Sequence, residues 1–178
     1  MNTTIPYYEI INRFLLGLLL AAGIALFHVQ EIMNWLSTES VQTLTIPAGL
    51  GAVATACFFA VFYEFGYIIN RISSVLTEEL LIRIKVWPKR GDYVQFNKAS
   101  ERYKKLPILA REYDFCKGQI TLFSVLVIYA VIQRIWPFVM IYASIIIFFA
   151  VSGWKFSERI NSLVKENEEY LKHGSKKA

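Results

Sequence analysis

The sequence predicts an all-α membrane protein that has four transmembrane helices, with cytoplasmic helical extensions of the second and fourth spans. Three observations lead to this prediction. Of the 178 residues, 55% are apolar and only 19% are charged, whereas about 25% of the residues of an ordinary soluble domain are charged. The apolar residues form long runs, and nearly all lysines and arginines lie in two segments outside these runs. A soluble fold of this size would expose much apolar surface, so we treat residues 1–178 as a single tetraspan membrane domain.

The first span is expected over about residues 14–33. Its apolar run, Phe14 to Val29, is about 16 residues long, slightly short of the roughly 20 that cross the hydrocarbon layer, and Met33 extends it. A cleaved signal peptide is the alternative. No A-x-A site follows the run and Arg13 is the only basic residue before it, so an uncleaved helix is expected.

The second span is expected over about residues 46–69, with Pro47 in its first turn, where the missing N–H costs nothing. Neither Gly nor Pro occurs between Tyr67 and Val86, so the helix should continue to Val86. It would then be about 60 Å long, roughly twice the hydrocarbon thickness, and half of it would project into the cytoplasm. Its apolar positions beyond the span recur at intervals of three and four: Ile68, Ile69, Ile72, Val75, Leu76, Leu80 and Ile84.

The third and fourth spans lie in one apolar stretch, Ile120 to Trp154, which is too long for a single crossing. The sequence Arg134-Ile135-Trp136-Pro137 divides it and predicts a tight hairpin between spans over about residues 119–135 and 138–154. A short helix is expected over about 93–105, and the tail should continue the fourth span as an amphipathic helix.

The distribution of basic residues predicts the orientation, because cationic loops stay on the cytoplasmic side. Eleven lysines and arginines lie in residues 71–118 and six more in 155–178, so both segments are assigned to the cytoplasm. Arg134 is then the only basic residue on the outer side. The expected location is the bacterial inner (plasma) membrane, with the N- and C-termini in the cytoplasm.

Small residues at four-residue spacing on the first two helices are candidates for close helix packing, since they let two backbones approach each other. They could pack the two helices of one chain together, or form a subunit interface in a homo-oligomer, and the two are compatible on different faces. The series are Gly17, Ala21 and Ala25 on the first helix, and Ala48, Ala52, Ala56 and Ala60 on the second.

Glu64 is the only acidic residue well inside an apolar run. An ionisable group costs about 2.5–3.5 kcal/mol at the centre of a span and less near the interface, so Glu64 needs a partner or water. A structural ion pair with Arg13 or Arg71 is one interpretation. A pore-lining or proton-sensing carboxylate is the other.

The basic residues of the long cytoplasmic segment are candidates for contact with anionic lipids or an acidic protein partner. They are interspersed with aromatic residues, which could suggest nucleic-acid binding, but with its six acids the segment 71–118 is only +5 and the topology already explains the bases. Direct nucleic-acid binding is therefore not expected. The candidates are Arg83, Lys85, Lys89, Arg90, Arg102, Lys104 and Lys105.

No catalytic, metal or cofactor site is expected. The two histidines, His28 and His173, fall on opposite sides of the membrane in this topology, so one chain cannot assemble a His-based zinc site. Cys57 and Cys116 are interpreted as apolar side chains. The sequence has no glycine-rich phosphate loop and no nucleophile elbow, so an enzyme is not expected.

Four short spans, little material outside, and a second span that continues as EFGYIINRISSVLTEELLIRIKVWP (64–88) into a basic cytoplasmic portion resemble the small four-helix membrane proteins of bacterial antiviral loci. Over the whole chain, in length and topology, the sequence is similar to the membrane subunit of Kiwa-type phage-defence systems. This resemblance implies a homo-oligomer in the inner membrane that detects phage attack on the envelope and works with a soluble cytoplasmic effector.

Two functions follow as hypotheses. The first is a non-enzymatic sensor or scaffold that oligomerises and couples an envelope or membrane perturbation to a cytoplasmic partner, along the projecting helices at 67–87 and 155–173. The alternative is an oligomeric pore or ion channel that acts as a membrane effector, and it is motivated by Glu64 and the alanine series on the second helix.

Overall fold

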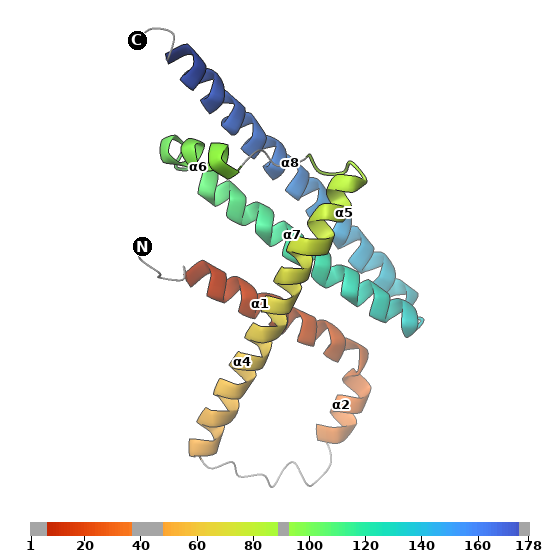
Figure 1. Cartoon of the computed structure of the whole chain (residues 1–178). Coiled ribbons are helices and arrows are strands. Elements are labelled where there is room, and N and C mark those ends of the chain that lie inside the picture. The colour runs from red at the N-terminus through yellow and green to blue at the C-terminus, as the bar shows by residue number, and fades with distance from the viewer. Residues whose placement is uncertain (1–6, 37–47, 89–92, 175–178) are drawn as a thin grey trace.

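The computed structural model of the chain describes residues 7–36, 48–88 and 93–174, and in these ranges it is built from helices (Figure 1). Four helical segments are long and apolar enough to cross a membrane, which confirms the predicted all-α class with four long apolar helices and is compatible with a multi-pass protein. The elements are α1 (Tyr7–Phe27), α2 (Val29–Leu36), α4 (Ala48–Ile72), the π-helical segment η1 (Ser73–Thr77), α5 (Glu78–Arg83), α6 (Tyr93–Arg102), α7 (Leu106–Ile132) and α8 (Trp136–Gly174).

Helices α7 and α8 form an antiparallel hairpin, and α1 packs against α7 in the same direction (Figure 1). Leu16 of α1 contacts Gly118 of α7, and Gly23 contacts Leu126 about two turns further on. The rod formed by α4, η1 and α5 crosses α1 and then α7 at a steep inclination. One apolar core forms where these helices meet, and its buried members are Leu16, Ile69, Leu122, Leu126 and Tyr142.

The crossing of α1 and α4 depends on two glycines. A Cβ atom at Gly17 would overlap the carbonyl oxygen of Phe62, and a Cβ atom at Gly66 would overlap the carbonyl oxygen of Arg13. Each helix therefore places a glycine against the backbone of the other, as helices do where small residues permit close approach. Beside the crossing, the rings of Phe14 and Phe59 stack with their centroids 3.9 Å apart.

The first and third spans differ from their predicted bounds. The first long helix is α1, Tyr7–Phe27, rather than residues 14–33, because the chain turns at His28 and α2 begins as a separate helix with polar Gln30 and Glu31. The third helix begins at Leu106, well before the predicted residue 119. Pro107 occupies its first turn, where proline is compatible with a helix, and the polar turns that follow pack against α8.

The predicted hairpin between the third and fourth spans is confirmed. Arg134 adopts a positive φ of 58°, its N–H bonds to the carbonyl of Val131 at 3.0 Å, and the N–H of Ile135 bonds to that of Ala130 at 3.0 Å. This is the Schellman pattern that ends many helices. The same pattern around Lys85, with φ of 60°, ends α5 at Arg83, three residues before the predicted end of the second helix.

The apolar series predicted along the second helix lies mostly on its exposed side, because a π-helical segment interrupts the helix. In an α-helix, residues four apart drift by about 40° around the axis, and the wider π turn of η1 compensates for this drift. The residues that face α7 and α8 are consequently Ile69, Ser73, Thr77 and Leu81. The exposed apolar residues are Ile68, Ile72, Val75, Leu76, Leu80 and Ile84.

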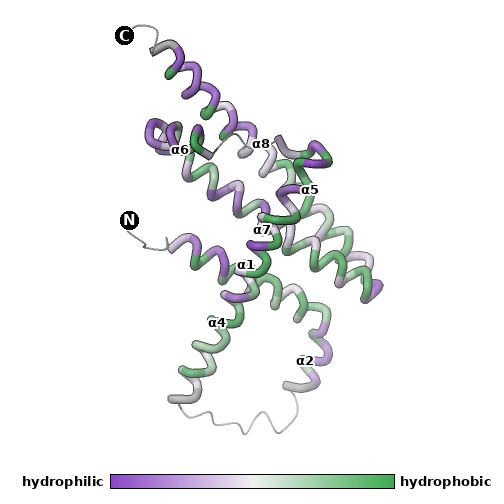
Figure 2. Tube along the Cα trace, viewed as in Figure 1, coloured by the Kyte–Doolittle hydropathy of each residue, from purple (hydrophilic) through white to green (hydrophobic). Residues whose placement is uncertain are grey.

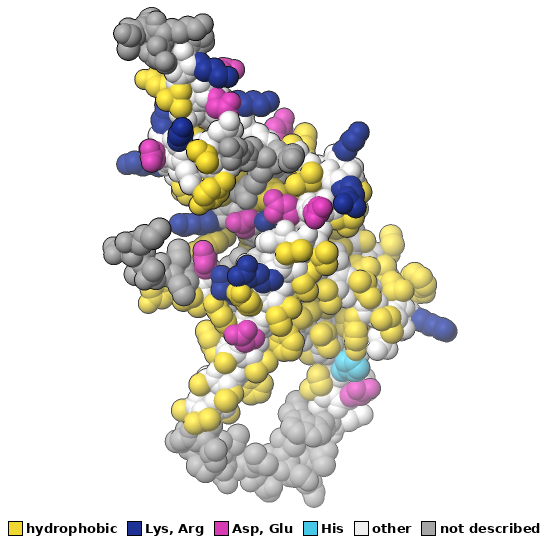
Figure 3. Space-filling view, in the orientation of Figure 1, with side chains coloured by type: hydrophobic (Ala, Val, Ile, Leu, Met, Phe, Trp, Pro, Cys, Tyr) yellow, Lys and Arg dark blue, Asp and Glu magenta, His cyan; other side chains and the backbone are white. Residues whose placement is uncertain are grey.

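Most of the described charged residues lie towards one end of the molecule, and many of them belong to a unit that we call the polar bundle: α6, residues 106–117 of α7 and residues 155–174 of α8 (Figures 2 and 3). Its apolar interior includes Ala99, Leu106, Ile160 and Val164. The short helix expected over 93–105 is confirmed as α6, which ends at Arg102. The fourth helix runs without a break from the apolar hairpin into the polar bundle as α8, Trp136–Gly174.

Replacing Gly17 or Gly66 with Ala is expected to lower the free energy of unfolding by at least about 1–3 kcal/mol, because the added methyl group meets backbone atoms that cannot move aside cheaply. Unfolding of the purified protein in detergent, followed by circular dichroism, measures the effect. Gly51→Ala is the matched control, since no atom from another described part of the chain lies within 4 Å of its Cβ position. Equal stability of all three variants would contradict the crossing described above.

Candidate functional site

A lysine is buried where the α4–η1–α5 rod crosses α7. The side chain of Lys117 is 4% exposed, and it lies near the middle of α7, three residues before Ile120, where the mainly apolar half of the helix begins. Removing an ammonium group from water costs several kcal/mol unless opposite charges and hydrogen bonds compensate. The surroundings of Lys117 therefore have to supply those groups.

Two carboxylates and a phenol complete this site, which we call the ion cluster: Glu78, Tyr113, Asp114 and Lys117. The Lys117 Nζ atom lies 2.7 Å from Oε2 of Glu78 and 3.0 Å from Oδ1 of Asp114. The hydroxyl of Tyr113 donates to Oε1 of Glu78 at 3.0 Å. Glu78 thus accepts from two residues of α7, and its side chain is only 18% exposed. The cluster joins the rod to the hairpin through charge-assisted hydrogen bonds.

The π-helical segment aims Glu78 at α7. The backbone N–H of Glu78 bonds to the carbonyl of Ser73, five residues earlier, which is the π-helical spacing. One residue before, the hydroxyls of Thr77 and Thr121 lie 2.7 Å apart. The hydroxyl of Thr121 donates a hydrogen bond to the carbonyl of Lys117 at 3.0 Å. Since a hydroxyl has one proton to donate, Thr77 is the donor in its hydrogen bond with Thr121. Single-turn π segments are frequent at functional sites.

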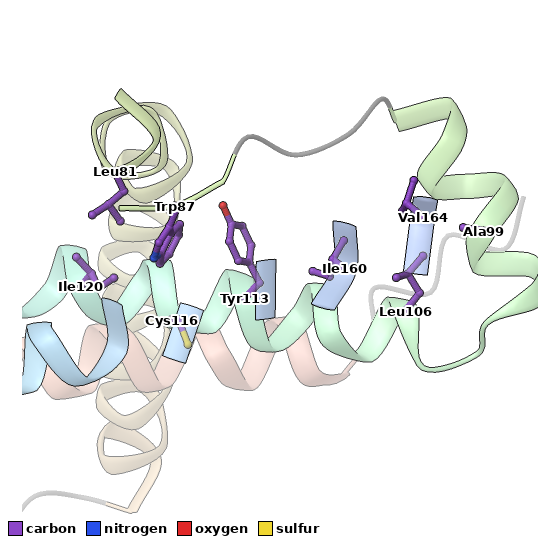
Figure 4. Close-up of a cluster of buried hydrophobic side chains, with 9 residues drawn as sticks. All are labelled: Leu81, Trp87, Ala99, Leu106, Tyr113, Cys116, Ile120, Ile160 and Val164. Carbon is purple, nitrogen blue, oxygen red and sulfur yellow. The ribbon is translucent and has the colours of Figure 1, made fainter. Parts of the chain in front are cut away.

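Trp87 packs beside Tyr113, one member of the ion cluster (Figure 4). Its side chain is 2% exposed, its indole Nε1 donates to the carbonyl of Ala150 at 2.8 Å, and its ring centroid lies 4.7 Å from that of Tyr113. The ring occupies the space that a side chain at Gly153 would need. Trp87, one of the aromatic residues interspersed among the bases, is therefore a core residue that fastens the end of α5 to α8.

The ion pair between Glu78 and Lys117 can be either made or broken, and the two cases correspond to different relative positions of the rod and the hairpin. A buried ion pair is weak support for stability, but breaking it by moving one partner is costly, so the cluster favours one relative position of rod and hairpin. A shift of α5 that separated Glu78 from Lys117 would leave a buried charge until water or another group reached it. Buried charges within apolar helices are functional candidates for this reason.

The predicted small-residue series have different surroundings. Gly17 packs at the crossing with α4, and Ala21 and Ala25 are half-buried. Packing of the second helix against the first through the alanine series is not observed: that contact is made through Gly66. Ala52, Ala56 and Ala60 are exposed in the single chain, and the side chain of Ala48 lies outside the described part.

The ion pair with Arg13 or Arg71, one of the two interpretations of Glu64, is not present among the described residues. Glu64 is exposed and makes no hydrogen bond or ion pair with a described residue. Arg13 instead donates to the hydroxyl of Tyr63 at 2.9 Å and lies 3.5 Å from Glu9. Arg71 donates to the hydroxyl of Tyr67 at 2.9 Å on its own helix. Both arginines are thus engaged by residues that the sequence analysis did not consider.

The predicted basic contact residues do not form one surface. Arg83 is exposed and pairs with Glu79 on its own helix at 3.5 Å, Lys85 lies in the turn that ends α5, and Lys89 and Arg90 lie outside the described residues. The other three come together, since Arg102, Lys104 and Lys105 line one cleft with Arg159 of α8. Burial and then the neighbouring Glu166 raise the pKa of Tyr103 in this cleft, so its hydroxyl remains protonated near neutral pH.

The ion cluster was missed because Lys117 was treated only as a marker of the cytoplasmic side. A signal was available: Asp114 and Lys117 are three residues apart immediately before an apolar run, the spacing of an ion pair on one helix face. Within the described residues, no three His, Cys, Asp or Glu side chains gather in a group that could hold a metal ion. Cys57 is exposed on α4 and Cys116 is buried in α7.

Replacing Lys117 with Met is expected to lower the free energy of unfolding by about 3–5 kcal/mol, because Glu78 keeps its charge in a largely buried position. Thermal unfolding in detergent measures this loss. The double variant Glu78→Gln/Lys117→Met should recover part of it, since no buried charge is then left alone. Arg83→Gln, which breaks the exposed pair with Glu79, is the control and should change stability by less than about 1 kcal/mol. If Lys117→Met lowers the free energy of unfolding as little as Arg83→Gln does, the ion cluster does not stabilise the fold.

The function of the chain has to be argued from this site, because no relative supplies one. The chain matches no protein-family model, no curated protein and no solved structure.

Proposed function

We propose that the protein is a non-enzymatic membrane sensor or scaffold that couples a perturbation of the membrane or envelope to a cytoplasmic partner. One observation carries the proposal: the buried Lys117 is held by Glu78 from a different helix, directly after a π-helical segment. Lys117 and most of Glu78 are enclosed between helices, and only Asp114 of the charged members is half exposed. The ion cluster joins two helical units, so its geometry suits the transmission of a movement from the rod to the hairpin better than a catalytic reaction.

The rod and the hairpin supply the two ends of the coupling. The α4 part of the rod crosses α1 at Gly17 and Gly66 and is exposed over residues 52–61, so it is the part most open to lipid or to a neighbouring subunit. Tilting this part moves Glu78 against Lys117, and α7 and α8 carry the effect into the polar bundle. We assign the polar bundle to the cytoplasm, together with both termini, because its basic residues favour that side.

The stimulus and the partner are taken from the resemblance to the membrane subunit of Kiwa-type defence systems. On that basis the protein is a homo-oligomer of the bacterial inner membrane, the stimulus is phage attack on the envelope, and the partner is a soluble effector that docks on the polar bundle. Co-purification from gentle detergent, out of cells that express the neighbouring genes, tests this part. A monodisperse monomer without an associated protein would contradict it.

The coupling itself is testable with the full chain in bilayers. Nitroxide labels at the exposed Cys57 of α4 and at Ser162→Cys of α8 report the distance between the rod and the polar bundle. Changing the lipid from long to short acyl chains should alter the tilt of the apolar helices and shift this distance by up to about 5 Å, the rise of one helical turn. Pulsed electron paramagnetic resonance measures the shift.

In Glu78→Gln the ion cluster loses a charge, so the rod and the hairpin should respond independently and the distance distribution should broaden. Arg83→Gln, outside the ion cluster, should respond like the natural sequence. Identical distances in both lipids for the natural sequence would refute the coupling.

A pore or ion channel is the second candidate function, and the exposed Glu64 favours it. A carboxylate on an apolar helix requires water or a partner, and Glu64 has no partner among the described residues. If α4 of several copies met around an axis, a ring of Glu64 carboxylates could line a cation path. Ala52, Ala56 and Ala60, which precede Glu64 at four-residue spacing, would then pack between subunits.

Conductance in planar bilayers tests the pore. The natural sequence should give cation-selective currents, and Glu64→Gln should lose most of the selectivity because the acidic ring is removed. Glu79→Gln, which removes an exposed carboxylate further along the rod, serves as the control and should leave the currents unchanged. Absence of current from the natural sequence, while its activity in cells is intact, would exclude this function.

A further inference from the structure

A basic cleft opens in the polar bundle between the α6–α7 connection and α8. Its volume is about 790 Å³. Four cations and four side chains with apolar surface line it, and no acidic side chain is among the described lining residues. The lining residues are Arg102, Tyr103, Lys104, Lys105, Ile108, Leu109, Arg159 and Leu163.

The cations of this cleft are available for a ligand. Three of these cations are exposed and form no ion pair with a residue in the described ranges: Lys104, Lys105 and Arg159. Arg102 lies over the ring of Tyr170, 3.7 Å from its centroid, which holds the guanidinium in place without neutralising its charge. The summed charge of the lining side chains is therefore +4, held within one concave surface.

The cleft also has an apolar wall that a small anion would not need. Ile108 is 55% exposed, and Leu109 and Leu163 are half-buried beside it. A ligand that contacts all of the lining residues must combine a negative group with hydrocarbon. Phosphate diesters that carry acyl chains have this combination.

The depth of the cleft relative to the membrane favours a lipid. Trp154 closes the apolar run of α8 and is partly exposed, as tryptophans at a membrane interface commonly are. Arg159 follows five residues later, about 7.5 Å along the helix, and the headgroup layer extends about 5–8 Å beyond the hydrocarbon on each side. Arg159 thus lies at headgroup depth when Trp154 lies at the edge of the hydrocarbon.

We propose that this cleft is a binding site for an anionic phospholipid, with the phosphate between Arg159 and the lysines of the α6–α7 connection and an acyl chain along Ile108. Basic pockets beside transmembrane helices recognise such headgroups through the same chemistry. The inference requires that the apolar helices cross a bilayer, but it does not depend on the proposed coupling function.

The test uses the full chain in detergent and measures lipid retention by native mass spectrometry. Phosphatidylglycerol should be retained over phosphatidylcholine with the same acyl chains. The double variant Lys104→Gln/Arg159→Gln should weaken phosphatidylglycerol binding by about 30-fold, from the loss of two headgroup contacts. The matched control is Lys155→Gln/Lys165→Gln, which removes the same charge from exposed positions of α8 outside the cleft, and it should retain the lipid.

Three results would overturn the proposal. The first is an equal loss in the control variant, which would assign the preference to overall charge. The second is displacement of the lipid by inorganic phosphate at equal concentration, which would show that the apolar wall contributes nothing. The third is the absence of any preference for phosphatidylglycerol in the natural sequence, which would point to an acidic protein as the occupant.

A measurement on the natural sequence covers the case in which the double variant does not fold. Phosphatidylglycerol with a photoactivatable acyl chain should label the peptides that contain Ile108 or Leu163. Labelling confined to peptides from other parts of the chain would place the lipid elsewhere and refute the site.

Discussion

The desolvated ammonium of Lys117 is the constraint around which the described helices are arranged. An unpaired charge in this position would cost several kcal/mol, so a carboxylate from the rod has to stay within hydrogen-bond distance of α7. That requirement fixes where α5 passes over the hairpin. The neighbouring hydrogen bond between Thr77 and Thr121 joins the rod to α7 at the same place. Trp87 then fixes the end of the rod to α8 and packs against the ring of Tyr113.

A second fixed point determines the direction of the rod. Gly66 is held against the backbone of α1, and Glu78 is held by Lys117, twelve residues further along the chain. These two contacts lie about 18 Å apart along the rod, and together they set the direction of its axis. Residues 52–58 of α4 precede the contacts with α1 and are exposed in the single chain. The inclination of α4 thus follows from the two glycine contacts with α1 and one ion pair with α7.

The number and order of the long apolar helices could be predicted from the sequence, because long apolar runs are visible without tertiary information. The hairpin at Arg134 was found in the same way. The facing side of the rod could not be predicted, since the inserted π turn replaces an apolar inner face with Ser73 and Thr77, and periodicity analysis assumes a regular helix. The pairing of Lys117 with Glu78 depends on a crossing between distant segments, which no local pattern encodes.

Helix α8 passes from the apolar hairpin to the end of the described chain without interruption, over 39 residues. Neither glycine nor proline occurs between Trp154 and His173, so this half has no point at which bending is favoured. About 30 Å of stiff helix therefore extends past Trp154. A rotation of the apolar part of α8 by roughly 10° would move the C-terminal end of the helix, with the polar bundle packed on it, through an arc of about 5 Å. This displacement is larger than the range of a van der Waals contact. A slight reorientation of the apolar part of α8 is therefore enough to separate a partner from its contacts at the C-terminal end of the helix.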